Sequence, residues 1–313
     1  MEQLVIKKEF RVRRTELTCP AHSMKMMTKA AASEADEVIL DLEDSCAVSQ
    51  KVAARQTLSE ALRTLDFKGK IRAFRPNNIR TKFFYRDLIE VVEAAGQNID
   101  VVVVPKVYGP EDVQFVDRLL TQIEQNIGFE LGRIKLEVLI ESAAAVLKAY
   151  DIASSCQRMA GLIFGIADFA GDIGAKELTK DQFQVYHYPK MQTIVAARAA
   201  GIDVVDNVTL QFRDLEQCRL DAIWASKMGF DGKWAIHPDQ IKIINQVFTP
   251  SPEEIKRAQE IMELYKKADL DSGLGAVVYK DEMVDAATLR VEWKKLLIAE
   301  KAGLLQGANA AAS

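Results

Sequence analysis

Two acidic residues of this chain, Glu141 and Asp168, each follow an apolar, strand-like run. About one βα unit, roughly 30 residues, separates them. At the carboxyl ends of neighbouring parallel strands, both carboxylates would reach one cation. Mg²⁺ suits such a pair because it keeps several waters and accepts substrate oxygens. The alternative is that each carboxylate caps a helix or pairs with a nearby cation.

Arg75, in the motif FRPN, follows another such run. Its guanidinium is always charged and can bind a carboxylate or a developing oxyanion. The alternative is a salt bridge to Glu43 or Asp44, which form a second acidic cluster in LDLEDS. Lys106 is interpreted as structural, because acidic neighbours would keep its ammonium charged, whereas Schiff-base chemistry needs a depressed pKa.

These residues belong to a regular pattern of eight apolar runs that alternate with amphipathic helical stretches. The runs are residues 15–21, 37–43, 71–77, 100–106, 135–141, 161–168, 203–207 and 233–238. Strict alternation predicts a parallel sheet, and eight units predict a (β/α)8 TIM barrel with its active site at the carboxyl ends of the strands. Asp206 and His237 end the last two runs, and His237 is interpreted as structural. An open, doubly wound sheet is the alternative, although no GxGxxG follows the first run.

The pattern changes after residue 248. Ser251, Pro252 and Glu254 form a capping-box helix start. A glycine-containing loop, a short β-like stretch and a final helix follow. We therefore predict a barrel catalytic domain over residues 1–248 and a C-terminal helical appendage over residues 249–313, which packs on or covers a neighbouring subunit.

Composition limits the class of protein. The 313 residues carry a net charge of −4, so a nucleic-acid partner is not expected. No apolar run approaches the roughly 20 residues that span a bilayer, and the charged N-terminal stretch is unlike a signal peptide. We expect a cytoplasmic protein without a membrane partner. Its four cysteines form no CxxC pair, which favours reduced thiols over a zinc site or disulfides.

Six motifs in order resemble those of one enzyme family. They are LDLEDS, FRPN, PKV, IESA, FGIADF and GKWAIHPDQI, with FFYRD and YKDEMVDAATL in addition. Together they resemble the citrate lyase β-subunit-like enzymes of the HpcH/HpaI aldolase superfamily. Within that group the chain is most similar to the malyl-CoA, β-methylmalyl-CoA and citramalyl-CoA lyases, over about residues 12–300.

The resemblance implies a TIM barrel that reversibly cleaves a 3-hydroxyacyl-CoA. The products would be acetyl-CoA or propionyl-CoA and a 2-oxo acid, either glyoxylate or pyruvate. The cofactor would be Mg²⁺, with Mn²⁺ as a substitute, and CoA would be part of the substrate. A homo-oligomer, trimer or hexamer, is also implied.

The resemblance assigns roles to individual residues. Glu141 and Asp168 match the metal ligands, and Arg75 matches the arginine that stabilises the thioester enolate. Asp285 matches a proton-transfer aspartate donated by an adjacent subunit. The backbone N–H groups near Ile166 and Ala167 would hold the carboxylate of the oxo acid.

The chain departs from the family pattern in two places. Ser23 stands where the family often has an arginine for the CoA phosphates, so Lys25 and Lys29 become the candidates. Glu43, Asp44 and Lys106 are expected to support the site or CoA.

The loop after Gly174 is shorter than in bacterial malyl-CoA lyases.

Four functions remain as alternatives to a CoA-ester lyase. They are a citrate lyase β-subunit acting on an acyl-carrier-protein thioester, a malyl-CoA thioesterase, a class II aldolase acting on free hydroxy-oxo acids, and a non-catalytic barrel.

Overall fold

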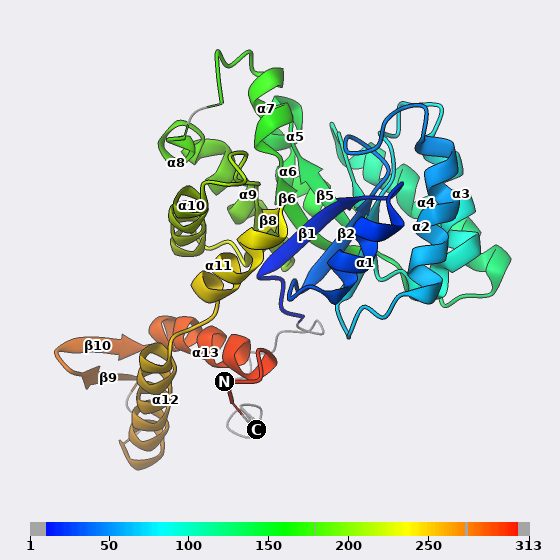
Figure 1. Cartoon of the computed structure of the whole chain (residues 1–313). Coiled ribbons are helices and arrows are strands. Elements are labelled where there is room, and N and C mark those ends of the chain that lie inside the picture. The colour runs from blue at the N-terminus through cyan, green and yellow to red at the C-terminus, as the bar shows by residue number, and fades with distance from the viewer. Residues whose placement is uncertain (1–10, 179, 273–274, 306–313) are drawn as a thin grey trace. The chain divides into compact units, whose positions relative to one another are not determined.

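The computed structural model of the protein describes residues 11–178, 180–272 and 275–305 (Figure 1). Its contacts divide the chain into two compact units. One is Arg13–Asn245, and the other contains Arg11, Val12 and the described residues from Gln246 onward. Each unit is described separately below.

The first unit is a closed barrel of eight parallel strands in sequence order, with β8 paired to β1. The strands are β1 (Thr15–Pro20), β2 (Glu37–Asp41), β3 (Ile71–Arg75), β4 (Val101–Val104), β5 (Lys135–Ile140), β6 (Met159–Phe164), β7 (Asp203–Asp206) and β8 (Gly232–Ala235). Each strand lies mainly within one of the eight predicted runs, so the TIM-barrel prediction is confirmed. The middle runs are recognisable as strands because they are apolar on both faces, as parallel strands covered by helices require.

The barrel interior contains an apolar layer at mid-height. Side chains that alternate along the strands form it, including Ile39, Val103, Leu139, Ile163 and Trp234. Because side chains two residues apart share a face of a strand, the residues flanking this layer also point inward, above and below it. The polar residues of the barrel therefore fall into two groups, one at each end.

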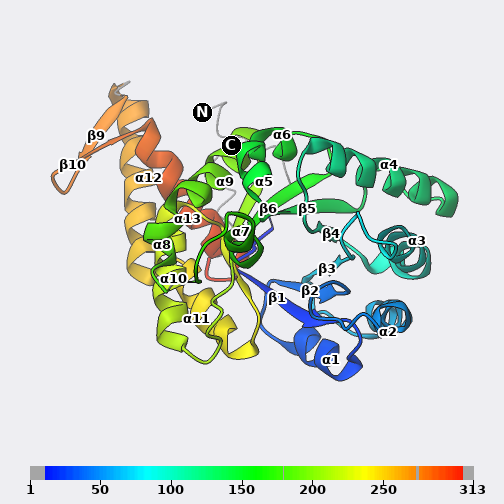
Figure 2. The ribbon, with the colours of Figure 1, turned by 90° about the horizontal axis from the view of Figure 1, so that it is seen from above.

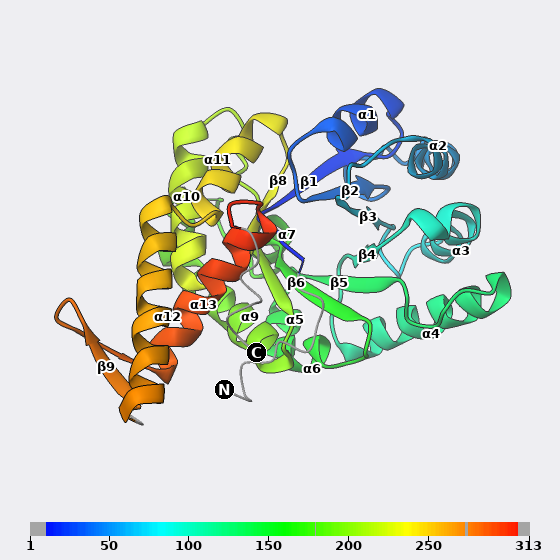
Figure 3. The same cartoon turned by 90° about the horizontal axis from the view of Figure 1, so that it is seen from below.

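Helices cover the outside of the barrel; Figures 2 and 3 show α1 to α4 outside strands β1 to β5 from opposite sides. The helices are α1 (Met24–Ala32), α2 (Lys51–Thr64), α3 (Phe84–Ala95), the 3-10 turn η2 (Gly96–Asn98), α4 (Pro110–Ile127), α5 (Ala143–Leu147), α6 (Ala149–Ala153), α7 (Ile166–Asp172), α8 (Gln182–Val185), α9 (His187–Ala200), α10 (Leu215–Met228) and α11 (Pro238–Phe248). The short helix α7 begins two residues after β6 ends, so the run expected over 161–168 is a strand only in its first half.

The second unit contains α12 (Pro252–Ser272), the antiparallel strands β9 (Ala276–Tyr279) and β10 (Glu282–Asp285), and α13 (Ala286–Lys301). The expected capping box is present: Ser251 Oγ accepts from the backbone N–H of Glu254 at 3.2 Å, and Glu254 Oε2 accepts from that of Ser251 at 2.9 Å. Ile255 and Ala258 pack against Leu296 from α13. Among the described helices of the chain, none combines the length and apolar character needed to cross a bilayer.

Candidate active site

Five of the chemistry-bearing residues gather at the carboxyl ends of the barrel strands. Arg75 is the last residue of β3, and Glu141 follows β5 directly. Glu43 and Lys106 lie two residues beyond β2 and β4, and Asp168 lies in the first turn of α7. Because parallel strands end at the same edge, consecutive units deliver these side chains to one mouth of the barrel.

Glu141 is the most constrained of these side chains. Its Oε1 accepts a hydrogen bond from the backbone N–H of Lys106 at 2.5 Å. A methyl group at Gly165 would lie 2.6 Å from its Cβ and 2.7 Å from its Oε2, so only glycine leaves room for this side chain. Burial and the charge of Asp168 raise the pKa of Glu141 to about 8. The carboxylate is therefore buried and short of positive charge.

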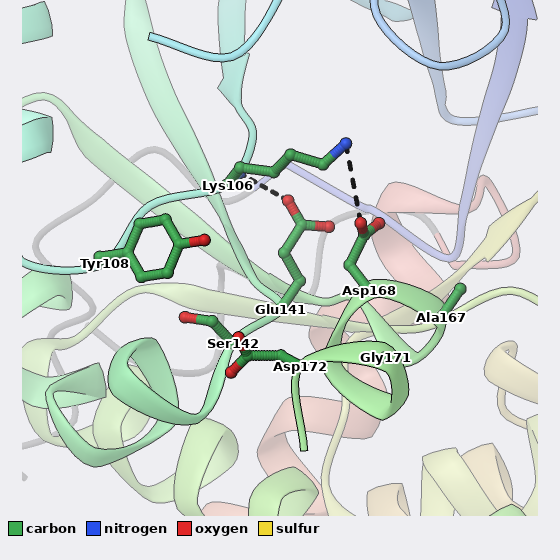
Figure 4. Close-up of a pocket in the computed structure, with 8 residues that line it drawn as sticks. All are labelled: Lys106, Tyr108, Glu141, Ser142, Ala167, Asp168, Gly171 and Asp172. Carbon is green, nitrogen blue, oxygen red and sulfur yellow. Dashed lines mark hydrogen bonds and ion pairs between the residues drawn. The ribbon is translucent and has the colours of Figure 1, made fainter. Parts of the chain in front are cut away.

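Asp168 faces the same space from the other side (Figure 4). Its side chain is 41% exposed, and its Oδ1 lies 3.6 Å from the Lys106 ammonium. Both carboxylates open into a pocket of about 440 Å³. The pocket is lined by Lys106, Tyr108, Glu141, Ser142, Ala167, Asp168, Gly171 and Asp172.

The Lys106 ammonium lies among carboxylates at this mouth. Its Nζ lies 2.7 Å from Glu43 Oε1 and 3.1 Å from Asp44 Oδ1, in addition to the Asp168 contact. Burial alone would lower the pKa of Lys106, but these acidic groups outweigh it and raise the pKa above its usual value. A lysine held charged in this way is not a Schiff-base nucleophile.

Arg75 is held at the mouth of the barrel by Asp41, a residue that sequence reasoning missed. Its Nε and one terminal nitrogen donate to the two oxygens of Asp41, both at 2.7 Å, and Glu43 lies 3.2 Å from the other terminal nitrogen. The pairing considered as the alternative, a salt bridge to Glu43, is thus also present. The two contacts with Asp41 are hydrogen bonds and the contact with Glu43 is an ion pair only, so three of the five guanidinium N–H donors are left for a ligand.

Burial alone would raise the pKa of Asp41, but Arg75 and Ser45 lower it to about 2. The sequence pattern could have indicated Asp41. It lies two residues before Glu43, so both side chains share the inward face of EVILDLE.

The last two residues of the sequence pattern do not join this cluster. Asp206 is fully buried between Lys190 at 2.5 Å and Lys233 at 2.8 Å, which neutralise it. His237 stacks on Phe212 with ring centroids 5.2 Å apart. Both contacts are those of structural residues.

The remaining predicted residues lie on helices. Ile166 and Ala167 begin α7, where the first backbone N–H groups of a helix have no acceptor within it. Lys25 and Lys29 lie one turn apart on α1 and are exposed, and Ser23 caps that helix. Asp285, in the second unit, caps α13 by accepting from two backbone N–H groups.

The donor set at the barrel mouth fits a hard divalent cation. Within the part of the chain that the structure describes, the cations paired with this acidic group are Arg75 and Lys106. The acidic residues are Asp41, Glu43, Asp44, Glu141 and Asp168. All candidate ligand atoms are oxygens, the chemistry that Mg²⁺ and Mn²⁺ share.

Comparison with known proteins decides the family. The model of the family described as HpcH/HpaI aldolase/citrate lyase matches residues 14–238. The chain belongs to the HpcH/HpaI aldolase/citrate lyase family. Its relatives in this family include an L-malyl-CoA/beta-methylmalyl-CoA lyase from Rhodobacter capsulatus, 37% identical over 90% of this chain and 92% of that protein. A citrate lyase subunit beta from Leuconostoc mesenteroides is 32% identical over 88% of this chain and 89% of that protein.

Solved structures agree with this membership. The protein CitE from Mycobacterium tuberculosis, in complex with magnesium, acetoacetate and coenzyme A, is 28% identical, with a TM-score of 0.74 over 93% of this chain and 98% of that chain. A citrate lyase from Burkholderia xenovorans has a TM-score of 0.82 over 97% of both chains at 22% identity, which supports the fold. As a member of the HpcH/HpaI aldolase/citrate lyase family, the chain is an enzyme of the oxo-acid-lyase type.

Proposed function

We propose that this enzyme reversibly cleaves a 3-hydroxyacyl-CoA of the malyl-CoA, β-methylmalyl-CoA or citramalyl-CoA type into an acyl-CoA and a 2-oxo acid. The observation that supports the proposal is the convergence of Glu141 and Asp168 on one pocket. The 37% identity to an L-malyl-CoA/beta-methylmalyl-CoA lyase favours this substrate class.

Glu141 and Asp168 would hold Mg²⁺ in this proposal. Glu141 is oriented by the Lys106 amide and by the space at Gly165, so it needs no rearrangement to act as a ligand. When bound, the cation would polarise the hydroxyl and carboxylate oxygens of the substrate. Lys106 neutralises the neighbouring Glu43, which limits the repulsion of an anionic substrate.

The other groups at the barrel mouth would bind the charged parts of the substrate. The N–H groups of Ile166 and Ala167, at the start of α7, would hold the carboxylate of the oxo acid. Arg75 would face the thioester oxygen with its remaining N–H donors as enolate charge develops. Lys25 and Lys29 would form ion pairs with the CoA phosphates. Both lysines are exposed, so each ion pair would add only a small amount to the binding free energy.

Asp285 would donate a proton to the enolate carbon in the cleavage direction and remove a proton from that carbon in the condensation direction. Hydrogen bonds from the Thr288 and Ala287 backbone lower the pKa of Asp285, which makes it a weak base in water. It would act from the C-terminal unit of a neighbouring subunit in a trimer or hexamer, where exclusion of water strengthens a carboxylate base. This requirement for a second chain is part of the proposal, as is a cytoplasmic location.

A coupled assay tests the function. The purified protein is given malyl-CoA and citramalyl-CoA with and without Mg²⁺, and the oxo acid and free thiol are both measured. We expect oxo acid and acyl-CoA to form only with the cation. Free malate without glyoxylate would indicate a thioesterase, and activity only on a carrier-protein thioester would indicate a citrate lyase β-subunit. Turnover of free hydroxy-oxo acids without CoA would indicate a class II aldolase.

A matched pair of variants tests the site. Asp168→Asn should lower kcat by about a thousandfold, because it removes a ligand of the cation on which charge stabilisation depends. Asp172→Asn is the control: this residue lines the same pocket but accepts a hydrogen bond from the Ala143 backbone at 2.7 Å. Equal losses in the two variants, or full activity in EDTA, would contradict the assignment.

A further inference from the structure

Three glutamates meet inside the barrel at the end opposite the pocket. Glu16 on β1, Glu37 on β2 and Glu137 on β5 are 0%, 0% and 1% exposed. One carboxylate oxygen from each can be chosen so that all three lie within 4.8 Å of one another.

The strand register creates this cluster. Glu16 and Glu37 are direct partners across the β1–β2 pair. Glu137 approaches from β5, and its neighbour in β6 is Gly161, where a Cβ would lie 3.2 Å from the Glu137 Cγ. Glu37 and Glu137 lie two residues below Ile39 and Leu139 of the apolar layer, so their side chains share its inward face.

The charges of the cluster are not balanced. Arg13 lies 3.2 Å from Glu37, 2.7 Å from Glu137 and 2.5 Å from Asp203, so one guanidinium is shared among several carboxylates. Among the residues that the structure describes, Glu16 has no such contact, although the charge of Arg13 acts on it at longer range. Both of its oxygens are buried and accept no hydrogen bond from the described part of the chain. A buried, ionised carboxylate without a partner is costly, and burial together with Glu137 and Glu37 raises the pKa of Glu16. Glu16 is therefore either protonated or ionised beside an additional positive group.

We propose that Glu16, Glu37 and Glu137 bind a hard divalent cation at the base of the barrel, as a second site distinct from the catalytic mouth. An all-carboxylate set suits Mg²⁺, Mn²⁺ or Ca²⁺. Glu137 lies on β5 and Glu141 directly follows that strand, four residues further on, which places the two sites about 13 Å apart. The role is structural, because the cation would join β1, β2 and β5 within the barrel.

Counting bound Mn²⁺ tests the proposal. The wild type, the double variant Glu141→Gln/Asp168→Asn and the variant Glu16→Gln are refolded in Mn²⁺, freed of excess metal, and analysed by elemental analysis and electron paramagnetic resonance. Refolding is included because buried ligands exchange slowly. We expect two ions per chain in the wild type and one in each variant. The double variant should retain an ion that resists EDTA, whereas Glu16→Gln should retain one that EDTA removes quickly.

Thermal unfolding gives a second measurement. The Tm of the double variant should rise with Mn²⁺ concentration, because a ligand bound only to the folded state stabilises it. No bound Mn²⁺ in the double variant overturns the proposal and means that the glutamates share protons instead. This result does not depend on whether Glu16→Gln folds. If the wild type binds one ion and the double variant also binds one, the result supports the site at the base of the barrel. The same result counts against the site at the mouth.

Discussion

The backbone N–H of Lys106 donates to Oε1 of Glu141 over 2.5 Å, from a residue whose φ is 53°. A lysine in this left-handed conformation is uncommon, and the surrounding structure must maintain it. The same residue directs its ammonium toward Glu43 and Asp168. Lys106 therefore contacts both proposed metal ligands, one through its backbone and the other through its side chain.

Gly165→Ala should disrupt the site without disturbing the barrel. The added methyl would collide with Cβ and Oε2 of Glu141, so the carboxylate must rotate away from the Lys106 amide. We expect Mg²⁺-dependent kcat/KM to fall by about 10- to 100-fold, the usual effect of disturbing a metal ligand's surroundings.

Gly171→Ala is the matched control for this substitution. Gly171 lies on α7 beside the pocket, and a methyl there would meet no atom within 4 Å. Circular dichroism should show both variants folded. Similar rates for the two variants would show that the position of Glu141 does not limit activity.

Lys106→Met should strengthen cation binding. The ammonium competes with a metal ion for Asp168 and Glu43, so its loss leaves the carboxylates more available. We expect the Kd for Mn²⁺ at the mouth to fall by roughly tenfold, about 1.4 kcal/mol. Lys106→Arg keeps the charge and should bind as the wild type does. Weaker binding in Lys106→Met, measured by calorimetry, would mean that the lysine organises the site and does not compete.

The Asp41–Arg75 pair should make stability depend on acid pH. Because the pKa of Asp41 in the folded protein is about 2, below its ordinary value of 3.8, its contribution is complete above pH 4 and is lost as pH falls toward 2. The shift corresponds to about 2 kcal/mol, of which roughly half is lost by pH 3. Urea unfolding of the wild type and Asp41→Asn should therefore give free energies of unfolding that converge as pH falls from 5 to 3.

Asp66→Asn serves as the control for the pH series, because Asp66 lies on the surface and its oxygen accepts a hydrogen bond from the nearby backbone N–H of Lys68. Its difference from the wild type should stay within about 0.5 kcal/mol. A difference between wild type and Asp41→Asn that is the same at every pH would show that the pair is not a source of the acid dependence.

Mixing two inactive variants tests whether Asp285 acts in a neighbouring subunit. Asn caps helices about as well as Asp, so Asp285→Asn should fold normally while losing proton transfer. When it is refolded together with Arg75→Gln, about a quarter of the sites would combine an intact barrel with an intact Asp285. Activity should reappear in the mixture and in neither variant alone.

Asp281→Asn, on the turn between β9 and β10, is the control for the mixing experiment and should keep full activity. A mixture that stays inactive while forming mixed oligomers would place the proton-transfer group elsewhere.

The sequence was sufficient to predict the barrel, because its middle strands are buried on both faces and are therefore near-continuous apolar runs, and because strands and helical stretches alternate strictly. The structure adds what periodicity does not report. Asp168 follows a strand in the sequence but lies in a helix, because Gly165 ends the apolar run and a short turn of helix intervenes. A run of eight apolar residues and a strand followed by a buried helix look alike in a single sequence.

The site was predicted less completely, because pairing across the barrel depends on register. The alternative considered for Arg75 was a salt bridge to Glu43 or Asp44; the Glu43 contact is present, but the bidentate partner is Asp41. Attention to the ends of the runs also concealed Glu16 and Glu137, which lie within them. Their inward direction was readable from alternation, but their approach to one another across the barrel was not.

The apolar layer formed by Ile39, Leu139 and their neighbours has a consequence for how this enzyme can change. It places apolar side chains between the barrel mouth and the glutamates at the base, so packing and not a shared hydrogen-bond network connects the two ends. Thermal stability can then be engineered at the base of the barrel, by changing Glu16 or its surroundings, while substrate preference is changed at the barrel mouth. The barrel behaves as two modules that share the same eight strands.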